Sequence, residues 1–244
     1  MGFIWSLANP LLMMGVFFLV FQVLLRSAPP QNCDINPGSR ECRIYYSYTA
    51  FILVGIMAWN FTSTVVTSGM MSLLGYASMI KKIYFPREVL PISTALGLFV
   101  NFLLSLIPLT FVIWINGIGF SWLSLMLPLF LFFHLLFLMG VALFLSVVVV
   151  YLRDLAHIID VILTAWFFLT PILYSMDQVF PTASQIMYWV NPIASFIESY
   201  RAILFFHYPP ALDFTLRTCL SGLVTFLLGY YFFIKTSRNV GEVL

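Results

Sequence analysis

The sequence predicts an all-α protein that crosses a membrane six times, with a re-entrant external segment between the fifth and sixth helices. Of its 244 residues, 62% are hydrophobic and only 8% are charged, whereas a soluble domain carries roughly 25% charged residues. So few charges cannot cover a water-facing surface, and lipid is therefore the expected solvent. The apolar runs are continuous and rich in Leu and Phe rather than alternating, which predicts helices and not a β-barrel.

The first predicted span covers residues 3–25 and begins almost at Met1. A span with nothing before it has no anchor at the membrane surface, so we expect an N-terminal segment to be missing from this chain. The loop at 26–46 is polar and rich in Pro, Asn and Gly, as loops are. It contains Cys33 and Cys42, with eight residues between them. These two form a disulfide if the loop faces an oxidising compartment, and otherwise remain two unpaired thiols.

The next four spans are separated by short polar segments. A charged loop at 81–88 separates the second span from the third, and a second charged loop at 151–157 precedes the fifth. The Ser/Thr-rich stretch around Thr62 in the second span favours close helix contacts. The predicted boundaries are 47–74, 91–115, 122–150 and 158–174, and the sixth span is 214–234. All six spans belong to a single transmembrane domain that comprises residues 1–244.

The stretch at 175–212 is the least regular part of the chain. Its prolines include Pro181, Pro192, Pro209 and Pro210, and the apolar pieces between them are too short or too interrupted to cross a bilayer. Non-helical backbone at membrane depth is tolerated only where protein or water shields it. We therefore expect short re-entrant or interfacial helices here.

The distribution of basic residues gives a weak indication of orientation. With six spans, both charged loops and the C-terminal tail lie on one side, which carries six basic residues against five on the other. The positive-inside rule therefore places the C-terminus in the cytoplasm. The six are Lys81, Lys82, Arg87, Arg153, Lys235 and Arg238.

Ionisable residues within apolar segments are candidates for function. For His134, in the fourth span, we favour a hydrogen bond to a neighbouring helix, for example to Asn60 or Asn101, over a proton relay. Arg153, His157 and Asp160 share one helical face, and we favour a salt-bridged helix start over a proton path. Glu198 and Arg201 are i, i+3 partners, and an internal ion pair and a place in a gate remain equally open. All of these residues lie in or next to apolar runs of the sequence.

No signature of catalysis occurs in the sequence. It has no G-x-x-x-x-G-K-[ST] phosphate loop, no metal-ligand spacing and no basic cluster for nucleic acid. We therefore expect no catalytic residues, no metal and no cofactor on this chain. If its transport is driven by ATP, another chain must supply the ATPase.

Five segments resemble the type-2 ABC exporter permeases of bacterial surface polysaccharides. The most specific is Ile80–Pro91, which reads IKKIYFPREVLP. All five segments occur along this chain in the same order as in the family. The other four are Trp5–Leu12 at the start of the first span, Arg153–Asp154 with His157 and Asp160, Phe168–Tyr174, and Asn191–Pro192 followed by Arg201. Members of this family usually begin with an amphipathic interfacial helix, and we expect this helix to be absent from the chain or truncated.

The resemblance implies a homodimer in the bacterial inner membrane, paired with two separate ATP-binding subunits. Its substrates are lipid-linked polysaccharides, and we expect O-antigen, with teichoic acid and capsule as alternatives. A proton-coupled secondary transporter and a membrane-embedded transferase are more remote alternatives. The resemblance assigns the cytoplasmic mouth and ATPase coupling to Lys81, Lys82, Tyr84, Phe85, Pro86, Arg87, Glu88, Arg153 and Asp154. It assigns the external gate to Asn191, Pro192, Glu198 and Arg201.

The cations of the first charged loop also suit a pyrophosphate-linked lipid head. Direct contact of a phosphate with Lys81, Lys82 or Arg87 and simple snorkelling of these side chains at the membrane surface are equally open.

Overall fold

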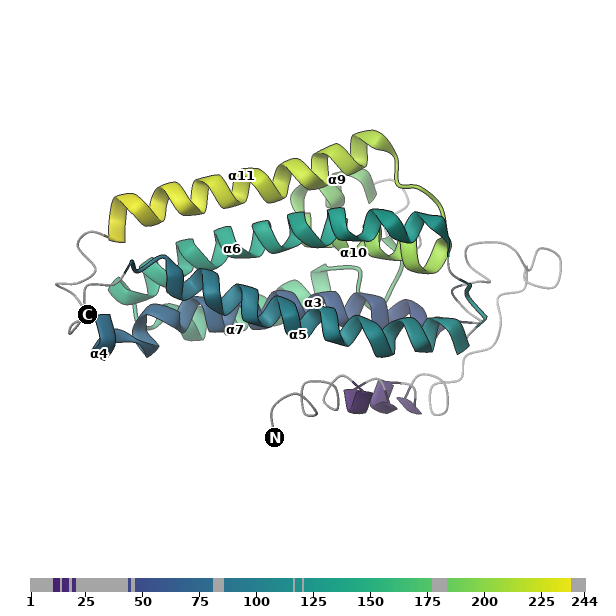
Figure 1. Ribbon diagram of the computed structural model, residues 1–244, viewed down its shortest axis with the longest axis horizontal. Coiled ribbons are helices and arrows are strands. Elements are labelled where there is room, and N and C mark those ends of the chain that lie inside the picture. Colours follow the sequence, from purple (N-terminus) through teal and green to yellow (C-terminus); the bar gives the residue numbers. More distant parts are fainter. Residues whose placement is uncertain are drawn as a thin grey trace.

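The computed structural model describes residues 11–13, 15–17, 19–20, 44, 47–80, 86–115, 117–119, 121–176 and 184–237. Within these ranges every regular element is a helix, which confirms the all-α prediction. The long helices run side by side along the longest axis of the molecule (Figure 1). The first predicted span falls mostly outside the described residues.

Within the described residues, four helical segments are long and apolar enough to cross a membrane. They agree with the second, third, fourth and sixth predicted spans to within three residues at each end. They are α3 (Tyr48–Gly75), α5 (Val89–Ile115), the continuous pair η2 (Trp122–Met126) and α6 (Leu127–Tyr151), and α11 (Leu212–Ser237).

Helix α7 (Leu155–Leu169) lies in the region of the predicted fifth span but has different boundaries. Its 15 residues reach only about 22 Å at 1.5 Å per residue, less than the ~30 Å hydrocarbon core. The helix begins three residues before the predicted start and stops five before the predicted end. The early stop has a local cause: Thr170 is extended (φ −91°, ψ 135°), as the residue before a proline prefers to be.

Short helices occupy the region that the prolines marked as irregular. They are α9 (Ser184–Val190), α10 (Pro192–Arg201) and the π-helix η3 (Ala202–Phe206). Apart from the half-buried Pro192, every residue of α10 and η3 is buried. His207 ends η3 in the left-handed conformation with φ 57°, which is uncommon for a residue other than Gly.

The centre of the bundle is formed by α3 and α6, and α6 lies between α3 and α11 in Figure 1. Glycines allow these helices to approach closely, as in many membrane helix pairs. A Cβ atom on Gly229 of α11 would collide with the backbone oxygen of Gly140 on α6. A Cβ atom on Gly69 of α3 would lie 2.6 Å from the Cβ of Ala142. The outer faces of α5 and α11 carry many of the exposed apolar side chains.

The order of the helices gives the bundle two distinct ends. At one end α3 and α6 finish, α5 and α7 begin, and α11 finishes; we call it the α4 end, after the short helix α4 (Ala77–Ile80). The opposite end holds the start of α11 and the buried helix α10, and we call it the α10 end.

Candidate functional site

The most elaborate polar network in the described part of the chain surrounds Arg201, the last residue of α10. This side chain is fully buried, with 0% of its surface exposed. Its Nη1 donates to the carbonyl oxygen of Pro171 at 2.5 Å, its Nη2 to that of Ile172 at 2.6 Å, and its Nε to that of Phe51 at 3.4 Å. The guanidinium also lies over the ring of Phe51. Carbonyl groups and an aromatic face thus replace the water that a buried cation loses.

The two carbonyl groups are available because α7 stops at Leu169. Asn191, at the start of α10, reaches the same segment: its Nδ2 donates to the hydroxyl of Thr170 at 2.9 Å. The Oδ1 atom of Asn191 accepts from the backbone N–H of Ala194 at 3.3 Å and so caps α10. Pro192 occupies the first helical position, where a missing N–H costs nothing. Both ends of α10 are therefore fixed to the segment that follows α7.

Glu198, the remaining predicted gate residue, is buried on the same helix. Its Oε1 accepts from the hydroxyl of Tyr208 at 3.1 Å, just beyond the π-helix η3. All four predicted gate residues thus lie on or at the start of α10, at one end of the bundle. The sequence identified these residues but none of the partners described above.

His134 links three helices in the middle of the protein. Its Nε2 lies 3.0 Å from the hydroxyl of Thr62 on α3, and its Nδ1 lies 3.0 Å from the hydroxyl of Tyr200 on α10. The ring also stacks on Phe196 at 4.7 Å. This confirms the predicted hydrogen bond to a neighbouring helix, although the partners are Thr62 and Tyr200 and not Asn60 or Asn101.

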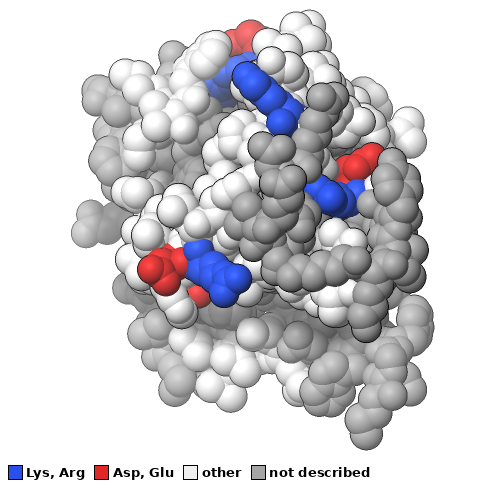
Figure 2. Space-filling model, turned by 90° about the vertical axis from the view of Figure 1, so that its left-hand side faces the viewer, with Lys and Arg blue, Asp and Glu red and all other residues white. Residues whose placement is uncertain are grey.

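At the α4 end the described members of the predicted cytoplasmic mouth lie close to the surface. Arg87 donates to the backbone carbonyl of Ser237, the last residue of α11. Arg153 and Asp154 are exposed in the turn between α6 and α7, and His157 and Asp160 are exposed in α7. Such exposure does not favour a buried proton path. Figure 2 shows the charged side chains of this end in a few small groups, in which basic and acidic side chains lie next to each other.

Several predicted site residues lie outside the described part of the chain. They are Lys81, Lys82, Tyr84 and Phe85 of the first charged loop and the two cysteines Cys33 and Cys42.

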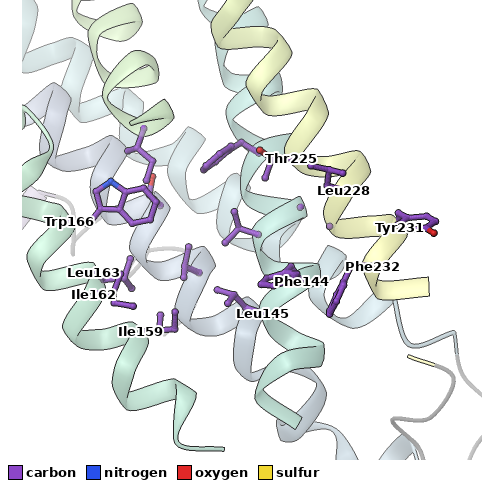
Figure 3. A pocket seen from close by; sticks show the side chains of 17 residues that line it. Phe144, Leu145, Ile159, Ile162, Leu163, Trp166, Thr225, Leu228, Tyr231 and Phe232 are labelled. Carbon is purple, nitrogen blue, oxygen red and sulfur yellow. The ribbon is translucent and has the colours of Figure 1, made fainter. Parts of the chain in front are cut away.

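An apolar hollow of about 530 Å³ lies between α7 on one side and α6 and α11 on the other. In Figure 3 Ile159, Leu163 and Trp166 of α7 face it from one wall. Phe144 of α6 and Leu228 of α11 face it from the other. Such a surface suits hydrocarbon, and no charged side chain lines it.

Some contacts have a sequence signal that could have been used. Gly55 leaves room for Arg201, because a Cβ atom there would lie 2.8 Å from its Nη2. Gly55 lies four residues after Phe51 and therefore on the same helical face. Arg217 on α11 lies over the rings of Trp189 and Phe214 and donates to the Ser195 hydroxyl at 3.3 Å. No local pattern distinguishes this arginine from an interfacial one.

Within the described residues no group of three or more His, Cys, Asp or Glu side chains could hold a metal ion. The site instead consists of hydrogen bonds that fix helices to one another, with an apolar hollow beside them. Such an arrangement can hold or release a conformation.

Comparison with known proteins gives a consistent result. Residues 1–205 match the model of the ABC-2 type transporter family. The chain is 32% identical over 215 residues to an O-antigen export system permease protein RfbA of Myxococcus xanthus, covering 86% of this chain and 75% of the relative. It is also similar to two proteins of that name from Klebsiella pneumoniae, at 28% and 26% identity, each alignment covering all of this chain and 88% and 87% of the relative. The chain belongs to the ABC-2 type transporter family, and its apolar helices make it a multi-pass membrane protein.

Proposed function

We propose that this chain is the permease subunit of an ATP-driven exporter that moves lipid-linked O-antigen from the cytoplasmic side across the bacterial inner membrane. The similarity over most of the chain to three permeases named for O-antigen export carries this proposal. A polymer with many hydroxyl groups cannot cross hydrocarbon unaided. Membership of the family implies an ATP-binding partner subunit.

The proposed assembly is a homodimer with two copies of the ATP-binding subunit. Each protomer crosses the membrane six times, with 3–25 as the first span and α7 with the segment after it as the fifth. The α4 end and the C-terminus face the cytoplasm, which agrees with the charged groups at that end (Figure 2). The α10 end then faces outward, and α10 with η3 forms a re-entrant external gate.

The charged residues of the α4 end have two proposed roles. Arg153 and Asp154, exposed in the turn before α7, contact the ATP-binding subunit. Lys81, Lys82 and Arg87 lie at the cytoplasmic mouth, where cations suit the pyrophosphate of a lipid carrier. Replacing all three cations by Ala abolishes export under this proposal and leaves the dimer and its partner intact. Unchanged export in cells with that triple substitution rules out the lipid-head role.

Deletion of the chain in its host tests the export function. We expect loss of O-antigen from the cell surface and accumulation of full-length, lipid-linked polymer that an impermeant glycosidase reaches only after the cytoplasmic side is opened. Loss of synthesis instead of accumulation indicates a transferase. Export that needs no ATP-binding subunit and stops when the proton gradient collapses indicates a secondary transporter.

A further inference from the structure

The segment that follows α7 runs outside any helix while it remains inside the protein. After Leu169 the backbone becomes extended at Thr170, so that the carbonyl groups of Pro171, Ile172 and Leu173 need partners from elsewhere. In a membrane such groups persist only where the protein supplies the donors.

The donors come from two other helices. The Arg201 guanidinium, on α10, binds the carbonyl oxygens of Pro171 and Ile172, and the Asn191 amide binds the Thr170 hydroxyl. From α3, the Tyr48 hydroxyl donates to the carbonyl oxygen of Leu173 at 2.8 Å. Hydrogen bonds from a charged donor are roughly twice as strong as neutral ones. The end of α7 is therefore held firmly against both α10 and α3.

The body of α7 is held much less firmly. Leu163 is its only buried residue, and Val161 and Phe168 are 70% and 66% exposed. Its inner face contacts α3, for example through Phe167 against Trp59. Toward α6 and α11 it faces the apolar hollow (Figure 3). Side chains across a hollow do not interlock, so movement there breaks few contacts.

We propose that α7 is a lever that pivots on the hydrogen-bonded segment at Thr170–Leu173 and swings across the hollow when its other end is moved. That other end is the Arg153–Asp154 turn, and the inference rests on the proposed function, in which this turn contacts the ATP-binding subunit. A rotation of about 10° about the pivot moves the far end of this helix by about 4 Å. The hydrogen bonds at the pivot keep α10 in a fixed position relative to the end of α7 throughout the transport cycle.

The first experiment joins the two sides of the pivot covalently. Thr170→Cys and Asn191→Cys are introduced together into a chain in which Cys33, Cys42 and Cys219 are replaced by Ser, and the pair is bridged by oxidation or by the shortest bifunctional methanethiosulfonate. The complete transporter, with its ATP-binding subunit, is compared before and after reduction. We expect ATP hydrolysis and export to be the same in both states. A reversible loss of about tenfold in either, equivalent to 1.36 kcal/mol, shows that the two sides separate and overturns the pivot.

The second experiment fills the hollow. Val141→Trp places a large ring in it, and Val100→Trp is the matched control, since Val100 is exposed on the outer face of α5. We expect export to fall by at least about tenfold in the first variant only, with the partner subunit still bound. Ile162→Trp, on the α7 wall, replaces the first variant if Val141→Trp does not assemble. Normal export with the hollow filled overturns the lever.

The two proposals fail in different ways. If the parent transporter hydrolyses ATP but moves no O-antigen, the proposed function is wrong. The effect of the bridge on ATP hydrolysis still tests the pivot in that case, because hydrolysis needs only the assembled subunits.

Discussion

The guanidinium carbon of Arg201 lies 3.6 Å from the centroid of the Phe51 ring, which joins the end of α10 to the first turns of α3. The geometry depends on Gly55, one turn further along α3, because any larger residue there would meet the Nη2 atom. A buried cation is stable only when every donor is satisfied. Burial of the Arg201 guanidinium therefore requires the Phe51 ring, the space left by Gly55 and the free carbonyl groups after α7 together. We call these groups the Arg201 set.

Replacement of Arg201 by Met tests this set. It removes the donors to Pro171 and Ile172 and leaves their carbonyl groups buried without those partners, which we expect to cost about 1–3 kcal/mol of unfolding free energy for each carbonyl group. Arg201→Lys retains the charge but lacks the planar fork that reaches two carbonyl groups, so it should fall between Met and the parent. Thermal unfolding of the purified transporter in detergent measures both.

The matched control is Arg153→Met, since Arg153 is exposed at the α4 end. Its effect should stay within about 0.5 kcal/mol. Equal stability of the Arg201→Met variant and the parent would show that the network does not support the fold.

A second prediction concerns the glycine contact between α6 and α11. Gly229→Ala places a methyl group on the backbone of Gly140 and must push the helices apart. We expect a loss of about 1–3 kcal/mol, as for an overpacked core. In Gly97→Ala, on α5, the methyl group meets nothing within 4 Å, and helix propensity favours Ala by about 0.5–1 kcal/mol. We therefore expect Gly229→Ala to lower the unfolding temperature and Gly97→Ala to raise it. A higher unfolding temperature in Gly229→Ala would contradict the close contact between α6 and α11.

A third prediction separates a structural role of His134 from proton transfer. His134→Ala removes a partner of the Tyr200 hydroxyl and should cost about 1–3 kcal/mol. His157→Ala, at an exposed position, should be nearly neutral. If His134 only holds helices together, His134→Gln keeps the parent's dependence of export on pH. A change in that dependence without a change in stability would support a proton relay instead.

The sequence predicted the fold where one strong physical signal dominates. Continuous apolar runs determine where helices can cross a membrane, so the boundaries of α3, α5, α6 and α11 were accurate. The irregular region was also recognised, because Pro192 and its neighbours cannot continue a long helix. The end of α7 was misplaced, because Thr170–Tyr174 is apolar enough to extend a span and only Pro171 argues against it.

The sequence singled out residues of the Arg201 network but not their contacts. Arg201 stood out because a charge in an apolar segment needs a reason. Its partners are backbone oxygens of Pro171 and Ile172, which carry no sequence signal at all. In the same way, Thr62 and Tyr200 meet His134 only because α3, α6 and α10 converge. Such residues are far apart in the sequence, so their contacts could not be predicted without the tertiary structure.

The final prediction concerns Arg87, whose side chain donates to the carbonyl group of Ser237 and so holds the last turn of α11. Helix ends expose carbonyl groups that a cation stabilises. Lys235 lies in that last turn, and trypsin can cleave after it only when the turn opens. In a chain in which Arg238 is replaced by Gln, so that trypsin cannot release the tag there, Arg87→Gln should therefore speed cleavage after Lys235 about tenfold, the factor for 1.4 kcal/mol, as followed by loss of a C-terminal epitope tag. Arg153→Gln, which removes an exposed arginine at the same end, should leave the rate unchanged; equal rates in both variants would show that Arg87 does not hold the helix end.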